Sequence, residues 1–210
     1  IYNVDVAANA LTSIINKLQN QLGSKIAKVY VGVGGQSMHT VKNCISRTLN
    51  EGDKISQELI DELYKENKDS IGNDTSILEV VPQEYIADNH TEVNPVGIVA
   101  QNITAQYMNI VARSILKSNL ERSLEQVGIT MADLILSPLA QTKSILTDSE
   151  MRSGCAIVDF GADTTTLSIY KNNLLRFLCV LPLGMNNVVK DICTMQMEEE
   201  DANWLLTQYG

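Results

Sequence analysis

The stretch CAIVDFGADTTTLSIY, residues 155–170, has the pattern of two strands joined by a tight turn. The apolar run at residues 156–158 predicts a buried strand, and the alternation of β-branched and polar residues at 165–170 predicts a returning strand. The turn between them holds Gly161 and several hydroxyl side chains. Backbone N–H groups point outward at such a turn, and glycine leaves room for close approach, so the stretch predicts a phosphate-binding hairpin.

Asp159, at the end of the first predicted strand, adds a candidate metal ligand. Mg²⁺ at phosphate sites usually keeps several waters and takes one or two carboxylates from the protein. Asp159 is placed to hold one of those waters. The alternative is an ordinary hairpin with Asp and Gly at its turn, because short motifs also occur by chance.

The composition limits the kinds of partner that the chain can have. Its 210 residues carry a net charge of −9, and 44% of them are hydrophobic. An acidic chain lacks the clustered Lys and Arg that neutralise nucleic-acid phosphates, so we expect no nucleic-acid partner. The cysteines are far apart and form no Cys-x-x-Cys pair, which argues against a zinc site or a disulfide framework and favours a reducing cytosol. These cysteines are Cys44, Cys155, Cys179 and Cys193.

The ends and the hydropathy of the chain give two further expectations. No run of 18 apolar residues is present, so we expect no membrane-spanning helix. The first residue is Ile1 and the last is Gly210. We therefore expect the sequence to be an excerpt from a longer chain.

The order of predicted elements indicates an α/β chain with an insertion. Residues 5–22 predict a helix and residues 26–33 a strand, which ends at a Gly-Gly turn. An α+β unit with the order β-α-β-β then occupies residues 36–110. Its predicted elements are a strand at 38–49, a helix at 56–68 capped by Ser56, a strand at 76–86 broken by Pro82, a polar loop at 88–95 and a strand at 97–108.

Alternating helices and strands resume after the insertion. The predicted elements are a helix at 111–126, a strand at 134–136, a helix at 138–146, the hairpin, a strand at 174–181 and a helix from Gly184 to 192. A last helix is predicted from Met197, with Trp204 and Leu205 docking its apolar face. Gly184 is a further candidate for contact with a phosphate, because helix N-termini bind anions.

Several stretches resemble a known family. VDFGADTTTLSIY is similar to the second phosphate-binding loop of the actin-like ATPase superfamily. ILEVVPQEYIADNHTEVNPVGIVAQNITAQYMNIV resembles subdomain 1C, the inserted subdomain of the bacterial cell-division family FtsA. Three more stretches resemble neighbouring parts of that family: KVYVGVGGQSMH, VGITMADLILSPLAQTKSILTDSE and LRFLCVLPLGMNNVVKDI.

The resemblance implies a partial actin-like (ribonuclease H-like) ATPase fold of class α/β, with an inserted α+β subdomain. Residues 1–35 and 111–154 would form part of subdomain 1A, residues 36–110 subdomain 1C, and residues 155–210 part of subdomain 2A. The implied cofactors are ATP and Mg²⁺. The implied contacts with phosphate and metal are Asp159, Gly161, Thr164 and Thr165, with Asp159 on the metal and Gly184 near the sugar or phosphates.

The resemblance also implies a biological role. Members of this family polymerise into filaments and link the FtsZ ring to the inner membrane, so the expected location is the cytoplasmic face of the cell membrane at the division site. The inserted subdomain, residues 36–110, would contact the neighbouring subunit and recruit later division proteins, and loop 88–95 is the expected partner-facing segment. The FtsZ-binding subdomain and the C-terminal membrane helix of the family have no counterpart in these residues.

Three positions depart from the family pattern. Ala162 and Asp163 stand where the phosphate loop has glycines, and Ser137 stands where many relatives have an acidic residue that orients the attacking water. Ala tolerates a left-handed backbone poorly, and serine is no base at neutral pH. We therefore expect at most a weak ATPase. Because the first phosphate loop of the family has no counterpart in these residues, we also expect ATP and Mg²⁺ binding to be weak or absent in this excerpt.

Two alternatives to the cell-division protein remain open. One is an actin-like assembly platform for pilus or secretion machinery, which shares the fold and an insert of similar size. The other is a small-molecule phosphotransferase of the same superfamily, which needs an Asp as base toward a substrate hydroxyl. Ser137 and the insert argue against the enzyme.

Overall fold

Residues 107–112 form a fully buried stretch of the chain. All six residues from Tyr107 to Ala112 are buried, which is typical of a central strand covered on both faces. The computed structural model describes residues 3–70, 72 and 74–210, so the predicted range 1–35 begins with two residues outside the description. The described chain forms two units, one of residues 1–34 and 40–144 and one of residues 35–39 and 145–210.

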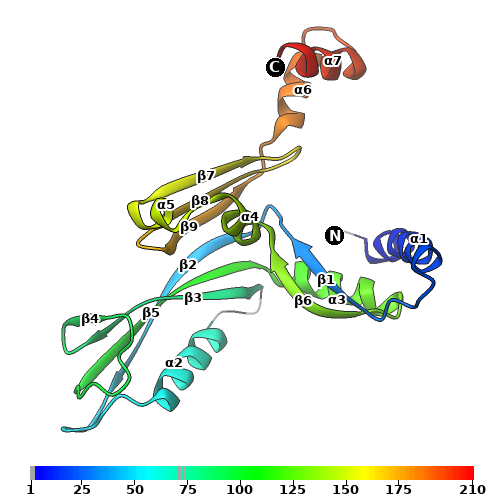
Figure 1. Ribbon diagram of the computed structural model, residues 1–210. Helices are drawn as coiled ribbons and strands as arrows, with labels where there is room; N and C mark the ends of the chain where they lie inside the picture. Colours follow the sequence, from blue (N-terminus) through cyan, green and yellow to red (C-terminus); the bar gives the residue numbers. More distant parts are fainter. Residues whose placement is uncertain (1–2, 71, 73) are drawn as a thin grey trace. The chain divides into compact units, whose positions relative to one another are not determined.

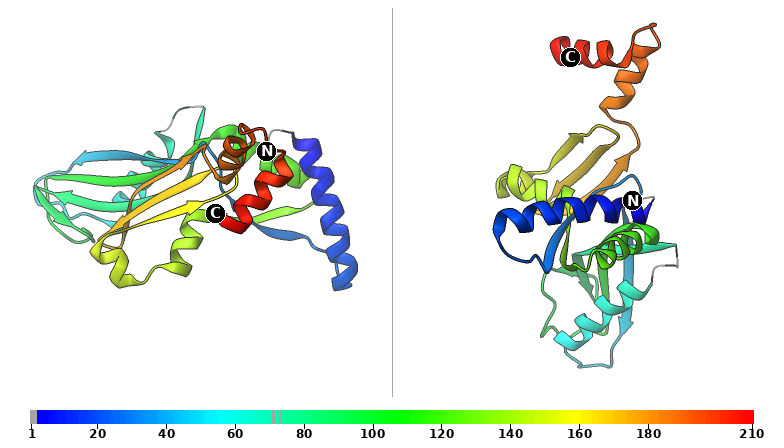
Figure 2. Two further views of the ribbon diagram at one scale, coloured as in Figure 1. Left: turned by 90° about the horizontal axis from the view of Figure 1, so that it is seen from above. Right: turned by 90° about the vertical axis from the view of Figure 1, so that its right-hand side faces the viewer.

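Within the first unit, the inserted segment builds an antiparallel sheet covered by a helix (Figures 1 and 2). The sheet has the order β4-β3-β5-β2, and α2 lies on one of its faces. The elements are β2 (His39–Thr48), α2 (Gln57–Asp69), β3 (Thr75–Ala87), β4 (His90–Glu92) and β5 (Asn102–Arg113).

A continuous apolar core joins α2 to this sheet. Ile60 and Leu63 of α2 pack with Val80 of β3 and with Ile103 and Tyr107 of β5. A buried amide pair adds specificity, because Asn67 and Asn109 each donate a side-chain hydrogen bond to the other, at 2.8 and 2.9 Å. Buried polar groups are tolerated when they are paired in this way.

The rest of the first unit combines two helices with a parallel pair of strands. The pair is β1 (Lys28–Val33) with β6 (Thr130–Leu136), and α1 (Val4–Leu22) packs against α3 (Ser114–Gln126). Asn3 caps α1 by accepting a hydrogen bond from the Val6 amide, and Gly23 ends it in a left-handed conformation. The helix α4 (Ser137–Ile145) follows β6 directly.

The second unit is built on an antiparallel sheet of β7 (Cys155–Phe160), β8 (Thr165–Lys171) and β9 (Leu174–Leu181). Its helices are α5 (Asp148–Ser153), α6 (Met185–Cys193) and α7 (Glu199–Tyr209), and α6 packs against α7. The segment 35–39 joins β9 at the free side of the sheet, where the Val180 amide donates to the Met38 carbonyl at 3.1 Å.

Most predicted elements are confirmed, some with shifted ends. The strand at 174–181 has the predicted bounds, Ser56 caps α2 by accepting from the Leu59 amide, and the sheet register shifts beside Pro82 as a bulge. The predicted α/β class with an inserted α+β unit is therefore correct. The helix predicted from residue 111 begins at Ser114, because residues 111–113 continue strand β5.

Three features of the structure differ from the sequence-based expectations. The polar loop predicted at 88–95 contains the short strand β4. Helix α5 has no predicted counterpart, although Thr147 and Glu150 form the reciprocal capping box that marks its start. Trp204 does not dock the last helix, because 57% of its surface is exposed and it contacts the ring of Tyr209 edge-on.

Candidate functional site

The predicted hairpin forms as two antiparallel strands with a four-residue turn. Asp159 lies opposite Thr166, and Phe160 lies opposite Thr165. The Gly161 amide then donates to the Thr164 carbonyl at 2.8 Å and closes the turn of residues 161–164. The sheet register therefore places the turn directly after the half-buried carboxylate of Asp159.

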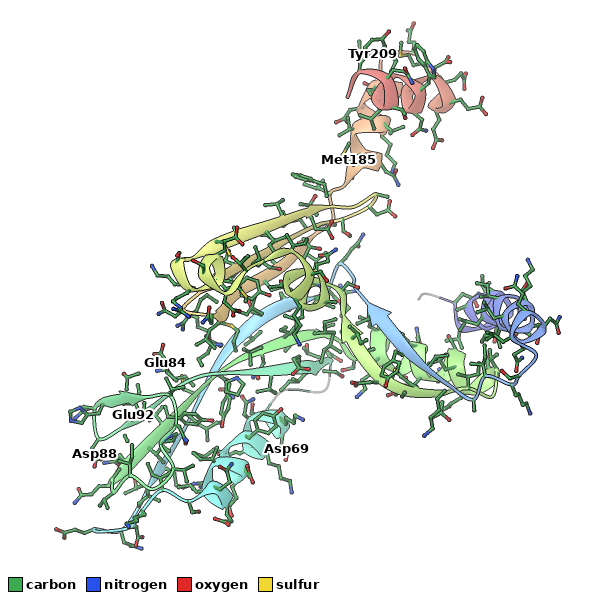
Figure 3. The ribbon with its side chains drawn as sticks, viewed as in Figure 1. Asp69, Glu84, Asp88, Glu92, Met185 and Tyr209 are labelled. Atoms are coloured by element: carbon green, nitrogen blue, oxygen red, sulfur yellow. The ribbon has the colours of Figure 1, made fainter. Side chains whose placement is uncertain are left out.

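The turn is bonded to the beginning of α6. The Met185 amide donates to the Gly161 carbonyl at 2.9 Å, and the Asn186 amide donates to the Ala162 carbonyl at 2.8 Å. Met185 marks the first residue of α6 in Figure 3. These two bonds occupy N–H groups that a helix N-terminus otherwise leaves without intrahelical partners.

Gly184 allows this close contact between the turn and α6. A Cβ atom at Gly184 would lie 2.5 Å from the Gly161 carbonyl oxygen and still closer to that of Ala162. Any side chain at this position would therefore force the turn away from the helix. The Gly184 amide donates to the Asn187 side chain at 3.0 Å, so the structure gives this glycine a packing role beside its predicted place in the nucleotide site.

The backbone of the turn explains how it accommodates non-glycine residues. In the described part of the chain, positive φ angles occur at Asp88, Asn89, Asn172, Asn173 and Gln196 among non-glycine residues. Ala162 and Asp163 are absent from this set, so the turn does not need glycine at either position for backbone reasons. Gly161 differs, because a Cβ there would lie 2.9 Å from the Thr164 carbonyl oxygen.

The groups available to an anion lie on the turn itself. Among the described residues, the amides of Ala162, Asp163 and Thr164 donate to no protein acceptor. The Thr165 hydroxyl donates to the Leu183 carbonyl at 2.7 Å, which fixes the side chain and leaves its oxygen lone pairs for an acceptor role. Three consecutive amides on one turn have the character of an anion-binding nest.

A metal ion at this turn would have few direct protein ligands. Within the described ranges, no group of three or more His, Cys, Asp or Glu side chains is arranged so that it could hold a metal ion. Mg²⁺ needs no such cage, because it binds through one or two carboxylates, phosphate oxygens and water. The half-buried Asp159 fits this requirement, since it lies on the strand that leads into the turn.

Two other predicted positions lie in the first unit. Ser137 is the first residue of α4, and its hydroxyl would lie 3.8 Å from a Cβ built at Gly34. Loop 88–95 is partly a tight hairpin, with Asp88 and Asn89 both at positive φ. Figure 3 shows Asp88 and Glu92 on this hairpin.

Asp88 has a structural task at the base of that hairpin. Its two carboxylate oxygens accept hydrogen bonds from the Gln101 and Asn102 amides, both at 2.8 Å. These amide donors hold the pKa of the Asp88 carboxyl below its ordinary value, with Gln101 contributing most. The carboxylate therefore fixes the start of β5 against the end of β3.

Asn186 is the site residue that the sequence reasoning missed. Its side-chain amide donates to an Asp163 carboxylate oxygen at 2.9 Å, in addition to the backbone bond to Ala162. The contact joins residues 23 positions apart, so no local sequence pattern announces it.

The fold places the chain in a structural class, because a solved structure has the same arrangement of helices and strands. A chain of a "PilM-PilN type IV pilus biogenesis complex" superposes with a TM-score of 0.57 at 16% sequence identity. The superposition covers 95% of this chain and 56% of the other. The fold is therefore a partial actin-like ATPase fold, as expected from the sequence.

Within that class, the family is FtsA. A family model described as "SHS2 domain inserted in FTSA" matches residues 35–111, and one described as "Cell division protein FtsA" matches residues 156–210. Proteins named cell division protein FtsA are similar over most of the chain: 32% identical in Porphyromonas gingivalis, 26% in Neisseria meningitidis and 25% in Bacillus subtilis. The chain belongs to the FtsA family.

The three alignments include at least 96% of the residues of this chain. They include only 43%, 51% and 49% of the P. gingivalis, N. meningitidis and B. subtilis proteins, respectively. It thus spans about half the length of the curated relatives it matches. Among the helices formed by the described residues, none is long and apolar enough to span a membrane.

Proposed function

We propose that the hairpin turn of residues 161–164 binds the phosphates of ATP together with Mg²⁺. The observation that carries this proposal is the run of three amides, Ala162 to Thr164, that lack protein acceptors within the described chain. The turn lies close after the half-buried residue Asp159, and two backbone hydrogen bonds join it to the first residues of α6. This combination fits a nucleotide phosphate better than it fits a purely connecting turn.

Each residue of the turn has a separate task in this proposal. Asp159 holds Mg²⁺ through a coordinated water, which lowers the repulsion between the phosphates and the carboxylate. The amides and the Thr164 hydroxyl would donate to phosphate oxygens, whereas the Thr165 oxygen, whose proton goes to the Leu183 carbonyl, would accept from a metal-bound water. Gly161 and Gly184 allow the backbone segments to approach closely. The metal ion, when bound, supplies charge neutralisation at the phosphates.

We propose little hydrolysis at this site. Ser137 stands at the position where the resemblance places an acidic residue in many relatives, and serine does not take a proton from water at neutral pH. The site would then serve as a nucleotide-dependent switch. A weak ATPase is the most that we expect.

At the level of the cell, we propose an actin-like division protein that forms filaments and links the FtsZ ring to the inner membrane. The match of residues 35–111 to the inserted domain of this family supports the assignment. Recruitment of later division proteins is assigned to residues 36–110, where the insert has a core of its own.

The pilus or secretion platform is the second candidate, since a pilus protein complex shares the fold. At 16% identity that likeness concerns the fold alone. The phosphotransferase has less support, because Ser137 supplies no base and the insert matches a division family.

Calorimetric titration of the natural full-length protein with ATP and Mg²⁺ tests the nucleotide proposal. We expect binding in the micromolar range, lost or weakened at least about tenfold in Asp159→Ala, because the metal loses its carboxylate. Asp148→Ala is the matched control, since Asp148 is an exposed acid in the same unit and outside the turn. No binding at millimolar ATP would overturn the proposal.

A further inference from the structure

Asp163 raises an electrostatic problem for a phosphate site. It places a carboxylate on the turn that we propose binds ATP. Repulsion between this negative charge and the phosphates at short range would lower the affinity for ATP. The two ion pairs found in the described part of the chain are Arg47–Glu66 and Lys117–Glu121, and neither involves Asp163. Its charge is therefore not neutralised by a basic side chain.

Asn186 lies where it can control that charge. Its side-chain nitrogen donates to Asp163 Oδ1 at 2.9 Å, and its backbone amide donates to the carbonyl of the preceding residue, Ala162, at 2.8 Å. Two bonds from one residue fix both the backbone of the turn and the direction of the carboxylate. The first turn of α6 also favours negative charge, because the N-terminal end of a helix carries a partial positive charge.

We propose that Asn186 is a positioning residue that holds the Asp163 carboxylate against the first turn of α6 and limits its approach to a bound phosphate. This inference rests on the proposed nucleotide function of the turn. It also explains why an acidic residue is tolerated at a position where the resembling phosphate loops have glycine. Without the Asn186 side chain, the carboxylate is free to rotate toward the phosphates.

A purely structural role for Asn186 would give a different pattern of variants. If Asn186 only stabilised α6 or the turn, its loss would weaken binding whatever residue stood at 163. If it acts on the Asp163 charge, the loss matters only while that charge is present. The two variants therefore have to be combined in one double-mutant cycle.

The test is ATP–Mg²⁺ titration of the natural full-length protein and of Asn186→Ala, Asp163→Ala and the double variant. We expect Asn186→Ala to weaken binding about tenfold, because an unrestrained carboxylate repels the phosphates. In the Asp163→Ala background, adding Asn186→Ala should change binding by no more than about twofold, whatever the affinity of Asp163→Ala itself. The same small effect of Asn186→Ala is expected in the Asp163→Asn background, which keeps an acceptor for Asn186 and removes the charge.

Asn187→Ala provides a matched control, because the Asn187 side chain accepts from Gly184 at the same helix start and does not contact Asp163. Any loss of affinity that it causes should persist when Asp163→Ala is added. If Asn186→Ala binds as wild type, or if it weakens binding as much in the Asp163→Ala background as in wild type, the inference is overturned while the nucleotide proposal stands. If wild type binds no ATP, both are overturned.

Discussion

The insert and the hairpin sheet differ in how much of their apolar surface they bury. In the insert, α2 and the sheet enclose side chains such as Leu63 and Ile103, both 0% exposed. In the β7–β8–β9 sheet, the register places Val158, Phe160, Ile169, Phe177 and Leu181 on one face, and all five are exposed in the second unit. The insert therefore encloses its core between α2 and its sheet. The hairpin sheet buries only the opposite face, with Leu175, Leu178 and Val180, and is bonded to α6 through its turn.

The largest expected effect is a difference in stability between a variant in the core of the insert and a variant on the exposed face of the hairpin sheet. Leu63→Ala should destabilise the protein by about 2–5 kcal/mol, because it removes a fully buried side chain and leaves a cavity. Phe160→Ala removes a larger side chain that is 69% exposed, and should change stability by no more than about 0.5 kcal/mol. Chemical denaturation of both variants measures the contrast. Equal losses would contradict the account of a self-contained insert.

A second variant tests whether packing in the second unit concentrates at the turn. Gly184→Ala places a Cβ against the Gly161 and Ala162 carbonyl oxygens, and should cost about 1–3 kcal/mol through forced backbone movement. Gly32→Ala is the control, because a Cβ at Gly32 would meet no atom within 4 Å. Thermal unfolding monitors both variants. A neutral Gly184→Ala would show that the turn can leave α6 without cost.

A smaller effect concerns the pH dependence of the insert. The pKa of Asp88 is lowered in the folded state, so its carboxylate stabilises the fold above the ordinary Asp pKa, and this contribution is lost as the pH falls through the lowered value. Asp88→Asn should therefore reduce the drop in melting temperature below about pH 4. Asn tolerates the left-handed backbone at this position. An unchanged acid profile would contradict the role of the Gln101 and Asn102 bonds.

The sequence predicts local elements well where the pattern has one meaning. The alternation at 174–181 indicates β9, and Ser56 precedes a helix as a capping residue. The sequence predicts boundaries less well where an apolar run fits either a strand or a helix. Residues 107–112 are such a run: all are buried in the structure, and periodicity alone does not distinguish the end of a buried strand from the start of the following helix. The sequence therefore predicts the end of this strand at residue 108, whereas β5 continues to Arg113.

The site was predictable in part. Asp159, Gly161, Thr164 and Thr165 are consecutive features of one hairpin, so local sequence brings them together. The contact of the turn with Gly184 and Asn186 depends on how β9 leads into α6, and no spacing rule encodes it. The role of these residues toward ATP stays a prediction.

Hydrogen exchange of the natural full-length protein, with and without ATP and Mg²⁺, tests the central claim most directly. We predict slower exchange with ATP and Mg²⁺ than without them in peptides covering residues 155–170 and 183–188, because phosphate binding engages the turn amides and holds the turn on α6. Peptides of β3 and β5 should exchange at the same rate in both states. Bound ATP without protection of the turn would contradict the assignment of this hairpin as the phosphate site.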